Sequence, residues 1–194
     1  MSKNRRPAQA AGSVRIVGGH WRGTRLAVAD AEGLRPTSDR VRETLFNWLM
    51  PQLPAATVLD VFAGSGALGL EAVSRGAASA TLIERDAGLM RNLRETVARL
   101  SAGDKIELLH EDALVAMARL AASGRRFDIA FLDPPFAADL WDKSLQAVLP
   151  LLADQAALYV EAPADRPPQP LPPGWRLHRE GATRDVAYRL YRRD

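Results

Sequence analysis

Hydrophobic and polar positions follow two periods along this chain, and the alternation between them organises the sequence. From residue 57 onward, strand-like apolar runs are separated by segments with helical periodicity. The expected strands are 57–62, 80–84, 105–109, 127–133 and 157–161, and the expected helices are 67–75, 87–100, a segment ending near 122, and 139–152. Strands separated by helices imply a parallel sheet with right-handed crossovers.

Both ends of the chain depart from this alternation. The last two strand-like runs, 175–180 and 185–192, have no helix between them, which predicts a terminal antiparallel hairpin. Near the N-terminus, the runs 14–17 and 24–28 flank a glycine-rich segment and favour a second, smaller hairpin. We therefore divide the chain into a basic tail with a β-hairpin, residues 1–34, and an α/β domain, residues 35–194, and we expect residues 1–12 to be disordered.

A helix is expected just before the α/β alternation begins. Either Ser38 or Asp39 can cap its N-terminus, and apolar residues then recur at helical spacing. Its aromatic residues Phe46 and Trp48 are interpreted as core and not as a platform for a nucleobase.

The glycine-rich turn after the first strand of the alternation is the first candidate for ligand binding. Gly64, Gly66 and Gly69 satisfy the G-x-G-x-x-G pattern of dinucleotide sites, so the glycines alone cannot choose a ligand. Asp60 precedes them by four residues, and a carboxylate there suits a ligand with a cationic end better than one with two phosphates. S-adenosylmethionine carries both an ammonium and a sulfonium. A glycine-rich turn without a ligand is the alternative.

Acidic residues recur at the carboxyl ends of successive expected strands. They are Asp60, Glu84, Asp112 and Asp133. Ligands bind at this edge of an open parallel sheet, close to the point where the strand order reverses. Any one of these acids could be a helix cap. Four like charges at one edge repel unless a ligand uses them, so together they indicate a site.

If the ligand is S-adenosylmethionine, each residue at this edge can be given a role. Glu84 can accept both ribose hydroxyls, as it would also in a dinucleotide site. Asp112 can accept from the adenine amino group while the Ala113 N–H donates to a ring nitrogen. Asp60 and the backbone of Gly64 and Gly66 would lie against the methionine end, and Phe62 is a further cofactor-binding candidate.

The tetrapeptide Asp133-Pro134-Pro135-Phe136 is the sharpest motif. Its two prolines lack N–H donors and make the turn rigid, which leaves carbonyl oxygens free to face a substrate. The Asp133 carboxylate and the Pro134 carbonyl can each accept one hydrogen of an exocyclic base amine, which frees the nitrogen lone pair for a methyl group. Phe136 can stack on the base. A plain proline loop after a strand is the alternative.

Charge is divided unevenly along the 194 residues. Residues 1–42 hold nine Lys or Arg and three acids, a net of +6, whereas the rest of the chain has a net of −3. Positive charge concentrated at one end is typical of a polyanion partner, although a solvated basic tail would look the same. The candidate RNA-binding residues are Arg15, Trp21, Arg22, Arg25 and Arg40. Trp21 can stack on a base or pack the hairpin onto the α/β domain.

Four classes of chemistry and location are disfavoured. The absence of cysteine excludes methylation of pyrimidine C5 through a cysteine adduct and a thiolate metal site, and the three histidines lack ligand spacing, so we expect no metal. No apolar run approaches the roughly 18 residues that a membrane span requires. Residues 1–13 lack the apolar segment of a secretory signal.

Together these motifs resemble one family over nearly the whole chain. The stretches are RIVGGHWRG from Arg15, RPTSDRVRETLFNWL from Arg35, DVFAGSGALGLEA from Asp60 and the DPPF tetrapeptide. They are similar to the bacterial 16S rRNA guanine-N2 methyltransferases that act on guanine 966. The resemblance implies a Rossmann-like fold with a seven-stranded, mostly parallel sheet and S-adenosylmethionine as donor. It also implies that the substrate is 16S rRNA in the small ribosomal subunit or its assembly intermediate. We expect a monomeric, cytoplasmic enzyme.

Two other classes of function stay open. An adenine-N6 methyltransferase of DNA or RNA would use the same tetrapeptide, although no separate DNA-recognition domain is expected in 194 residues. An inactive RNA-binding module with the same fold, or a nicotinamide oxidoreductase built on the glycines, would not need the acids. Intact Asp60 and Asp133 argue against both.

Overall fold

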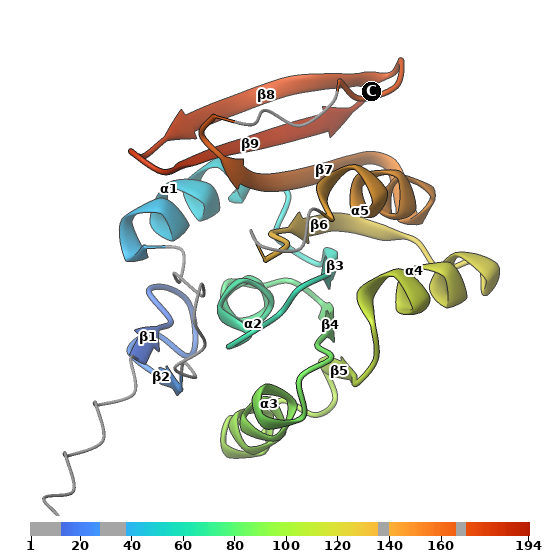
Figure 1. Ribbon diagram of the computed structural model, residues 1–194. Helices are drawn as coiled ribbons and strands as arrows, with labels where there is room; N and C mark the ends of the chain where they lie inside the picture. Colours follow the sequence, from blue (N-terminus) through green and yellow to red (C-terminus); the bar gives the residue numbers. More distant parts are fainter. Residues whose placement is uncertain (1–12, 28–37, 136–139, 166–169) are drawn as a thin grey trace, which may run out of the picture.

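A seven-stranded sheet forms the centre of the computed structural model, which describes residues 13–27, 38–135, 140–165 and 170–194. Its strand order is β5-β4-β3-β6-β7-β9-β8 (Figure 1). The strands are β3 (Thr57–Asp60), β4 (Ser79–Ile83), β5 (Ile106–Leu109), β6 (Phe127–Leu132), β7 (Leu152–Pro163), β8 (Trp175–Ala182) and β9 (Val186–Arg193). The pairs from β5 to β7 are parallel, while β9 is antiparallel to both β7 and β8. The expected parallel sheet with a terminal hairpin is confirmed, and its order reverses between β3 and β6.

Helices cover both faces of this sheet (Figure 1). The helices are α1 (Asp39–Leu49), α2 (Ala67–Ser74), α3 (Ala87–Arg99), α4 (Ala113–Ala122) and α5 (Trp141–Val148), which continues into a 3-10 turn, Leu149–Leu151. Residues of α1, α2 and α3 share one hydrophobic cluster, and residues of α4 and α5 share another. We call these sides the α1 face and the α4 face.

Strand β6 shows why the sheet separates the two clusters. Ile129 and Phe131 belong to the cluster of the α1 face, whereas Ala130 and Leu132 belong to that of the α4 face. Successive side chains of a strand point to opposite faces. Each fully buried large apolar side chain contributes about 1.5–3 kcal/mol relative to exposure, so both faces of this central strand must be covered.

The helix expected after Ser38 is confirmed. The Ser38 hydroxyl accepts a hydrogen bond from the Val41 N–H at 3.3 Å and so caps α1. Phe46 is fully buried and meets Phe131 edge-on, with ring centroids 6.0 Å apart. Trp48 is half buried and stacks on Tyr188 of β9 at 5.7 Å. Both aromatic residues therefore contribute to packing.

The N-terminal hairpin is also confirmed. Strand β1 (Ser13–Arg15) pairs antiparallel with β2 (Arg25–Ala27), with Val14 opposite Leu26. Ile16 and Leu26 are each 1% exposed and belong to the hydrophobic cluster of the α1 face. The hairpin thus shares a core with the α/β domain, and the division of roles at residue 34 stays a prediction.

Backbone hydrogen bonds attach the hairpin turn to α2. The His20 N–H donates to the Ser74 carbonyl at 2.7 Å, and the Trp21 N–H donates to the Ser74 hydroxyl at 2.9 Å. Gly19 lies so close that an added Cβ would be 1.9 Å from the Ser74 carbonyl oxygen. Only glycine permits this approach.

Three expected boundaries were wrong. The strand expected over 57–62 ends at Asp60, because the turn toward Gly64 begins at Val61, although the N–H groups of Val61 and Ala63 still donate to Phe131 of β6 and Ile83 of β4. The helix expected over 139–152 runs from Trp141 to Val148 before its 3-10 turn, and residues 136–139 are outside the described part. Strand β7 has 12 residues, not five, because it already pairs at Leu152 and then passes an irregularity. No helix within the described ranges is long and apolar enough to cross a membrane.

Candidate active site

The glycine turn between β3 and α2 lies where the strand order reverses. Gly64 and Gly66 have φ angles of 55° and 78°, in the left-handed region that favours glycine. A Cβ on Gly66 would lie 2.6 Å from the Leu93 side chain, whereas one on Gly64 would meet no atom within 4 Å. Packing therefore explains Gly66, while Gly64 leaves open space beside its backbone, as a close-lying ligand requires. Phe62 is half buried and packs against the cluster of the α4 face.

Asp60, the last residue of β3, is buried behind this turn. It is 3% exposed, and its Oδ2 accepts a hydrogen bond from the Gly69 N–H at 2.9 Å. Burial raises the pKa of Asp60 to about 7; the Gly69 bond opposes the rise and the Glu84 carboxylate adds to it. Asp60 thus joins the end of β3 to the first turn of α2. A nearby cation would favour its ionised form.

Glu84 follows β4 directly and holds the glycine turn from the other side. Its Oε2 accepts from the Gly64 N–H at 2.9 Å and its Oε1 from the Asp86 N–H at 2.8 Å. Each carboxylate oxygen has a second lone pair, so hydroxyl groups can still bind there. The predicted role at a ribose fits this geometry, and the contact with the glycine turn is a role that the sequence did not indicate.

Asp112 caps α4. Its Oδ1 accepts from the Leu114 N–H at 2.9 Å and from the Val115 N–H at 3.4 Å. The possibility that one of the four acids is a helix cap is therefore realised here, and Asp86 caps α3 in the same way. Ala113 is the first residue of α4, where an N–H has no partner within the helix. A role for this pair at adenine stays a prediction.

Asp133 and Pro134 lie at the carboxyl end of β6, next to β3. Asp133 is half buried and Pro134 is buried. Burial raises the pKa of Asp133 well above its usual range, and the negative charges of Glu161 and Asp60 raise it further. An acid in this environment, once ionised, is a stronger base than a solvated aspartate. Phe136, the predicted stacking residue, lies outside the described residues.

Glu161 is a fifth acid at this edge that the sequence interpretation missed. It is 5% exposed near the end of β7, and the register that places Leu132 opposite Val160 puts it beside Asp133. The Tyr159 hydroxyl donates to its Oε1 at 2.7 Å. Burial first, and the charge of Glu161 second, raise the pKa of Tyr159 well above its usual range. Glu161 closes the expected strand 157–161, so the strand-end rule applied to the other acids would also have found it.

The predicted RNA-binding arginines are exposed. Arg15, Arg22, Arg25 and Arg40 all have exposed side chains, and Arg15 lies 3.7 Å from Asp39. Arg42 belongs to the same basic segment but is fully buried, with Asp39 and Glu71 as ionic partners. Its charge therefore cannot contribute to an RNA-binding surface, and the +6 of residues 1–42 overstates what a partner can reach.

Trp21 has the double character that the sequence left open. It is half buried, packs against the cluster of the α1 face, and meets His20 edge-on at 6.5 Å. Packing of the hairpin is thus one of its roles. Its exposed part can still meet a base, and that contact stays a prediction.

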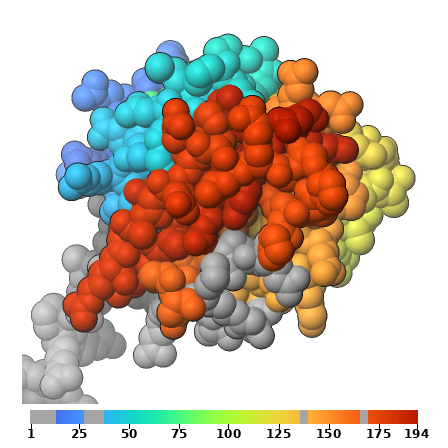
Figure 2. All heavy atoms as spheres, turned by 90° about the horizontal axis from the view of Figure 1, so that it is seen from above, coloured from blue at the N-terminus to red at the C-terminus, as the bar shows by residue number. Residues whose placement is uncertain are grey.

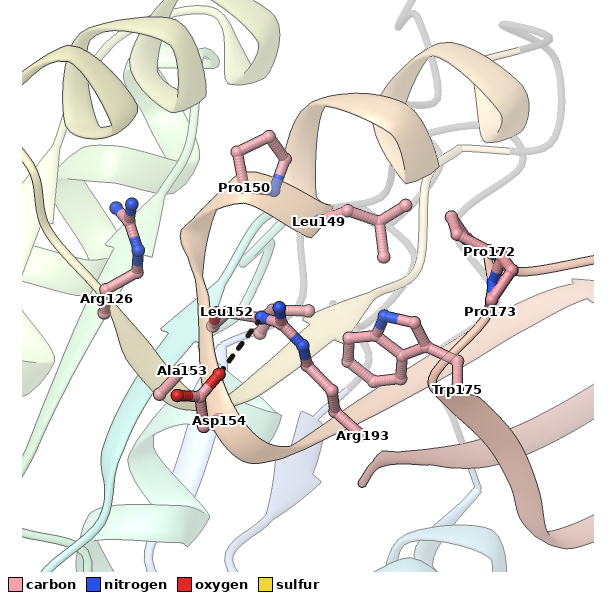
Figure 3. Close-up of a pocket in the computed structure, with 10 residues that line it drawn as sticks. All are labelled: Arg126, Leu149, Pro150, Leu152, Ala153, Asp154, Pro172, Pro173, Trp175 and Arg193. Carbon is pink, nitrogen blue, oxygen red and sulfur yellow. Dashed lines mark hydrogen bonds and ion pairs between the residues drawn. The ribbon is translucent and has the colours of Figure 1, made fainter.

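An open hollow of about 670 Å³ lies at the opposite end of the sheet. Arg126 precedes β6 and Leu152 begins β7, so the hollow is at the amino ends of these strands (Figure 3). Trp175 and Arg193 line it from the C-terminal strands, and Arg193 faces Asp154 at 3.8 Å. This hollow is far from the acids and the glycine turn, and so it is not part of the candidate active site.

The residues at the carboxyl edge fit S-adenosylmethionine. The open space beside Gly64 lets a ligand approach the backbone. The carboxylate of Glu84 suits the hydroxyl groups of such a ligand, and the buried acid Asp60 suits its cationic end. Within the described residues, no group of three or more His, Cys, Asp or Glu side chains is placed to hold a metal ion.

Comparisons with known proteins give one consistent family. Residues 14–192 match the family described as Conserved hypothetical protein 95. The chain is 48% identical over 185 residues to a ribosomal RNA small subunit methyltransferase D of Escherichia coli, covering 94% of this chain and 91% of that one. A protein of the same description from Haemophilus influenzae is 41% identical, covering 94% and 95%. A solved structure from Escherichia coli has a TM-score of 0.84 at 44% identity and covers 94% of this chain and 99% of its own.

Proposed function

The chain belongs to the family described as Conserved hypothetical protein 95, and we infer that it is an enzyme that methylates small-subunit ribosomal RNA with S-adenosylmethionine as donor. We propose that the acceptor is the exocyclic N2 of guanine 966 in 16S rRNA. The observation that carries the exocyclic-amine chemistry is Asp133-Pro134 at the end of β6, adjacent to the glycine turn that follows β3. Guanine is favoured over adenine, which the same tetrapeptide would serve, by the resemblance of the longer stretches that begin at Arg35 and Asp60. A methyl donor on that turn and an amine on that tetrapeptide would meet at the same edge.

Different residues of this chain hold the methionine end, the ribose and the adenine of the donor. The backbone of Gly64 and Gly66, with Phe62 beside them, borders the methionine end, and Asp60 stabilises the turn from behind. Glu84 accepts the ribose hydroxyls. Asp112 and the Ala113 N–H face the adenine ring. When bound, S-adenosylmethionine supplies a methyl group made electrophilic by the sulfonium.

Asp133 and Pro134 orient the acceptor. An exocyclic amine is a poor nucleophile because its lone pair is delocalised into the base. If the Asp133 carboxylate and the Pro134 carbonyl each accept one N–H, the nitrogen twists toward tetrahedral and its lone pair becomes available. Positioning and electrostatic stabilisation then provide the catalysis, and Phe136 stacks on the base.

The proton of the methylated amine needs an acceptor at the same place. Asp133 already accepts one of the amine hydrogens, and its raised pKa makes its carboxylate a suitable base. Glu161 lies beside it and supports this by its negative charge. The pair therefore takes up the proton without a metal ion or a covalent intermediate.

The exposed arginines of the N-terminal hairpin bind the RNA backbone. Arg15, Arg22 and Arg25 present their charges to solvent, while Ile16 and Leu26 fix the hairpin to the α/β domain. Phosphate contacts of this kind give affinity and orientation and not base selection. We further propose that the protein acts as a cytoplasmic monomer.

Mapping of modified nucleotides tests the proposal directly. 16S rRNA from cells with and without this protein is digested and analysed by mass spectrometry and primer extension. We expect N2-methylguanine at position 966 only when the protein is present. N6-methyladenine in RNA or DNA would favour the adenine-N6 alternative, and no change in either would favour an inactive RNA-binding module. Light scattering tests the monomer.

A further inference from the structure

The C-terminal strands β8 and β9 form a basic ribbon at one end of the sheet. Residues 175–194 contain six arginines and three acids, a net of +3, whereas residues 43–174 contain 11 basic and 17 acidic residues, a net of −6. A single division of the charge at residue 42 averages this basic ribbon with the acidic centre of the chain.

Three arginines concentrate the charge of the ribbon. Arg176 of β8 lies directly opposite Arg192 of β9, and Arg179 follows on β8 after a bulge. We call these three residues the C-terminal arginine cluster. Like charges directly opposite each other destabilise a strand pair. Their mutual repulsion also shows in the pKa of Arg192, which is lowered by burial first and then by Arg176 and Arg179.

His178 reports the same field from within the cluster. Its pKa is lowered by burial first, and then by the charges of Arg192, Arg179 and Arg176. Each of these groups disfavours a further positive charge nearby. The local potential around His178 is therefore positive.

The acids around the cluster neutralise little of this charge. Arg176 pairs with Asp194 at 2.7 Å, but both side chains are more than half exposed, and such surface pairs contribute about 0–1 kcal/mol. Arg179 donates to the backbone carbonyl of His178 at 3.3 Å. The Nε of Arg192 is buried and has no hydrogen-bond partner among the described residues. The exposed guanidinium groups of Arg176 and Arg179 can therefore be reached by a partner, whereas the buried Nε of Arg192 cannot.

Protection of a sheet edge explains only part of the cluster. Charged side chains on an edge strand hinder edge-to-edge association, and β8 is the edge strand that carries Arg176 and Arg179. Arg192, however, lies on β9, which is paired on both sides. An arginine there adds repulsion without protecting an edge.

The position of the cluster connects it with the N-terminal hairpin. Leu190 belongs to the hydrophobic cluster of the α1 face, and Arg192, two residues further along β9, points to the same face. Ile16 of the hairpin belongs to that same cluster. In Figure 2 the red C-terminal strands form an outer surface with cyan atoms beside them and blue atoms beyond. The N-terminal hairpin and β9 thus pack on the same face of the sheet.

We propose that the C-terminal arginine cluster is a second RNA-binding surface, which contacts backbone phosphates of the same ribosomal RNA that the N-terminal hairpin binds; this rests on the proposed function. Guanidinium groups keep their charge at all relevant pH values and match phosphate oxygens in two-pronged hydrogen bonds. Arg192 lies opposite Ala157 of β7, and its neighbour Arg193 lines the hollow at the amino ends of β6 and β7, so this surface lies away from the carboxyl edge. It would therefore contact RNA that is remote from the target base.

The double variant Arg176→Gln/Arg179→Gln tests this surface. Its matched control, Lys105→Gln/Lys143→Gln, removes two exposed positive charges that lie away from the cluster, on the segment before β5 and on α5. Binding of a 16S rRNA fragment is measured at several salt concentrations, together with KM and kcat for methylation. We expect the log–log salt slope of the first variant to flatten by about 1.4, at about 0.7 per lost single-strand phosphate contact, and its KM to rise. The control and the S-adenosylmethionine affinity should match wild type.

A second variant separates RNA binding from folding. Arg192→Gln removes one of the opposed charges, so we expect an unchanged or higher melting temperature together with weaker RNA binding. A lower melting temperature with wild-type RNA binding would overturn the proposal, since Arg192 would then be structural. A wild-type salt slope and KM in the double variant would also overturn the proposal. This holds even if that variant self-associates, since the arginines would then only protect the edge strand. The proposed methylation of 16S rRNA would be unaffected by that result. Failure of the wild-type protein to methylate 16S rRNA would instead contradict the proposed function.

Discussion

Two clusters of like charge occupy different parts of this protein. At the carboxyl edge, Asp60 and Glu161 are almost fully buried and Asp133 is half buried. On the C-terminal ribbon, Arg176 and Arg179 are exposed and Arg192 is half buried. The acids are enclosed by strands and helices, whereas the arginines lie on the outer end of the sheet.

Carboxyl and guanidinium groups respond differently to the repulsion within their clusters. A carboxyl group can relieve repulsion by binding a proton, and the pKa values of Asp60 and Asp133 are raised accordingly. A guanidinium keeps its charge, so repulsion within the arginine cluster can be relieved only by anionic groups, such as Asp194 beside Arg176 or an anionic partner. The acidic edge is therefore suited to a cationic donor and to proton transfer, and the basic ribbon to a polyanion. The experiments below test this contrast, beginning with the largest expected effect.

Replacing Asp133 should separate catalysis from cofactor binding. In Asp133→Ala, we expect turnover to fall at least about 100-fold, since orientation and proton removal both act through this group. Asp133→Asn should retain part of the activity because its amide oxygen still accepts a hydrogen bond. Methyl transfer to 16S rRNA gives the rate, and calorimetry should show nearly unchanged S-adenosylmethionine affinity. A wild-type rate in the alanine variant would refute the amine-orienting role.

Glu84 should matter for the donor and not for RNA. Glu84→Ala leaves ribose hydroxyls and the Gly64 N–H without an acceptor, which should weaken S-adenosylmethionine binding by about 1–3 kcal/mol. Glu84→Gln is the matched control, because it keeps an acceptor oxygen and should lose less. Calorimetric titration measures both. Equal affinity in wild type and the alanine variant would mean that the donor does not lie against Glu84.

The N-terminal arginines should behave oppositely to Glu84. Arg15→Gln/Arg22→Gln/Arg25→Gln should flatten the salt slope of rRNA binding by about two units, with S-adenosylmethionine affinity unchanged. Trp21→Ala separates the roles of the adjacent aromatic residue. Lost stacking would weaken RNA binding by about 1–3 kcal/mol with little change in slope, whereas lost packing would lower the melting temperature. A triple variant with the wild-type slope would exclude the hairpin from the RNA-binding surface.

Glu161 should shift the pH dependence of methylation. Asp133 must be ionised to accept the amine hydrogen, so activity is lost as pH falls through its pKa. Because the Glu161 charge contributes to raising that pKa, Glu161→Gln should move the acidic limb of kcat/KM to lower pH, by up to about one unit. Tyr159→Phe, which keeps the carboxylate, should not move the limb downward. An acidic limb that stays in place in Glu161→Gln would show that the two acids do not act together.

Asp60 should show its smallest effect in stability, which is measured without cofactor. Its folded-state pKa of about 7 exceeds the ordinary 3.8, so the folded state binds the proton more tightly and Asp60 contributes less stability as pH rises between these values. The asparagine in the variant Asp60→Asn does not titrate. The free energy of unfolding of this variant should therefore rise relative to that of wild type across that pH window, by more than about 1 kcal/mol. Denaturant unfolding at pH 5 and pH 8 without cofactor measures the difference. A constant difference would place the Asp60 pKa near its ordinary value.

The sequence determined the local elements and the carboxyl edge. The alternation of period two and period 3.6 placed the strands and helices, because each depends on which side of a short segment is buried. Asp60, Glu84, Asp112 and Asp133 could be assigned to one edge because parallel strands end together. Glu161 also stands at the end of an expected strand, 157–161, so the sequence contained the signal that places it at the same edge.

Tertiary structure decided which charges are buried and which lie together. Arg42 looked like any other basic residue of its segment, but packing of α1 on α2 buries it against Glu71. Asp133 and Glu161 are neighbours because β7 pairs with β6, and Arg176 opposes Arg192 because β8 pairs with β9 in that register. Periodicity cannot supply these facts, since burial, pKa shifts and charge clusters depend on contacts between residues far apart in the chain.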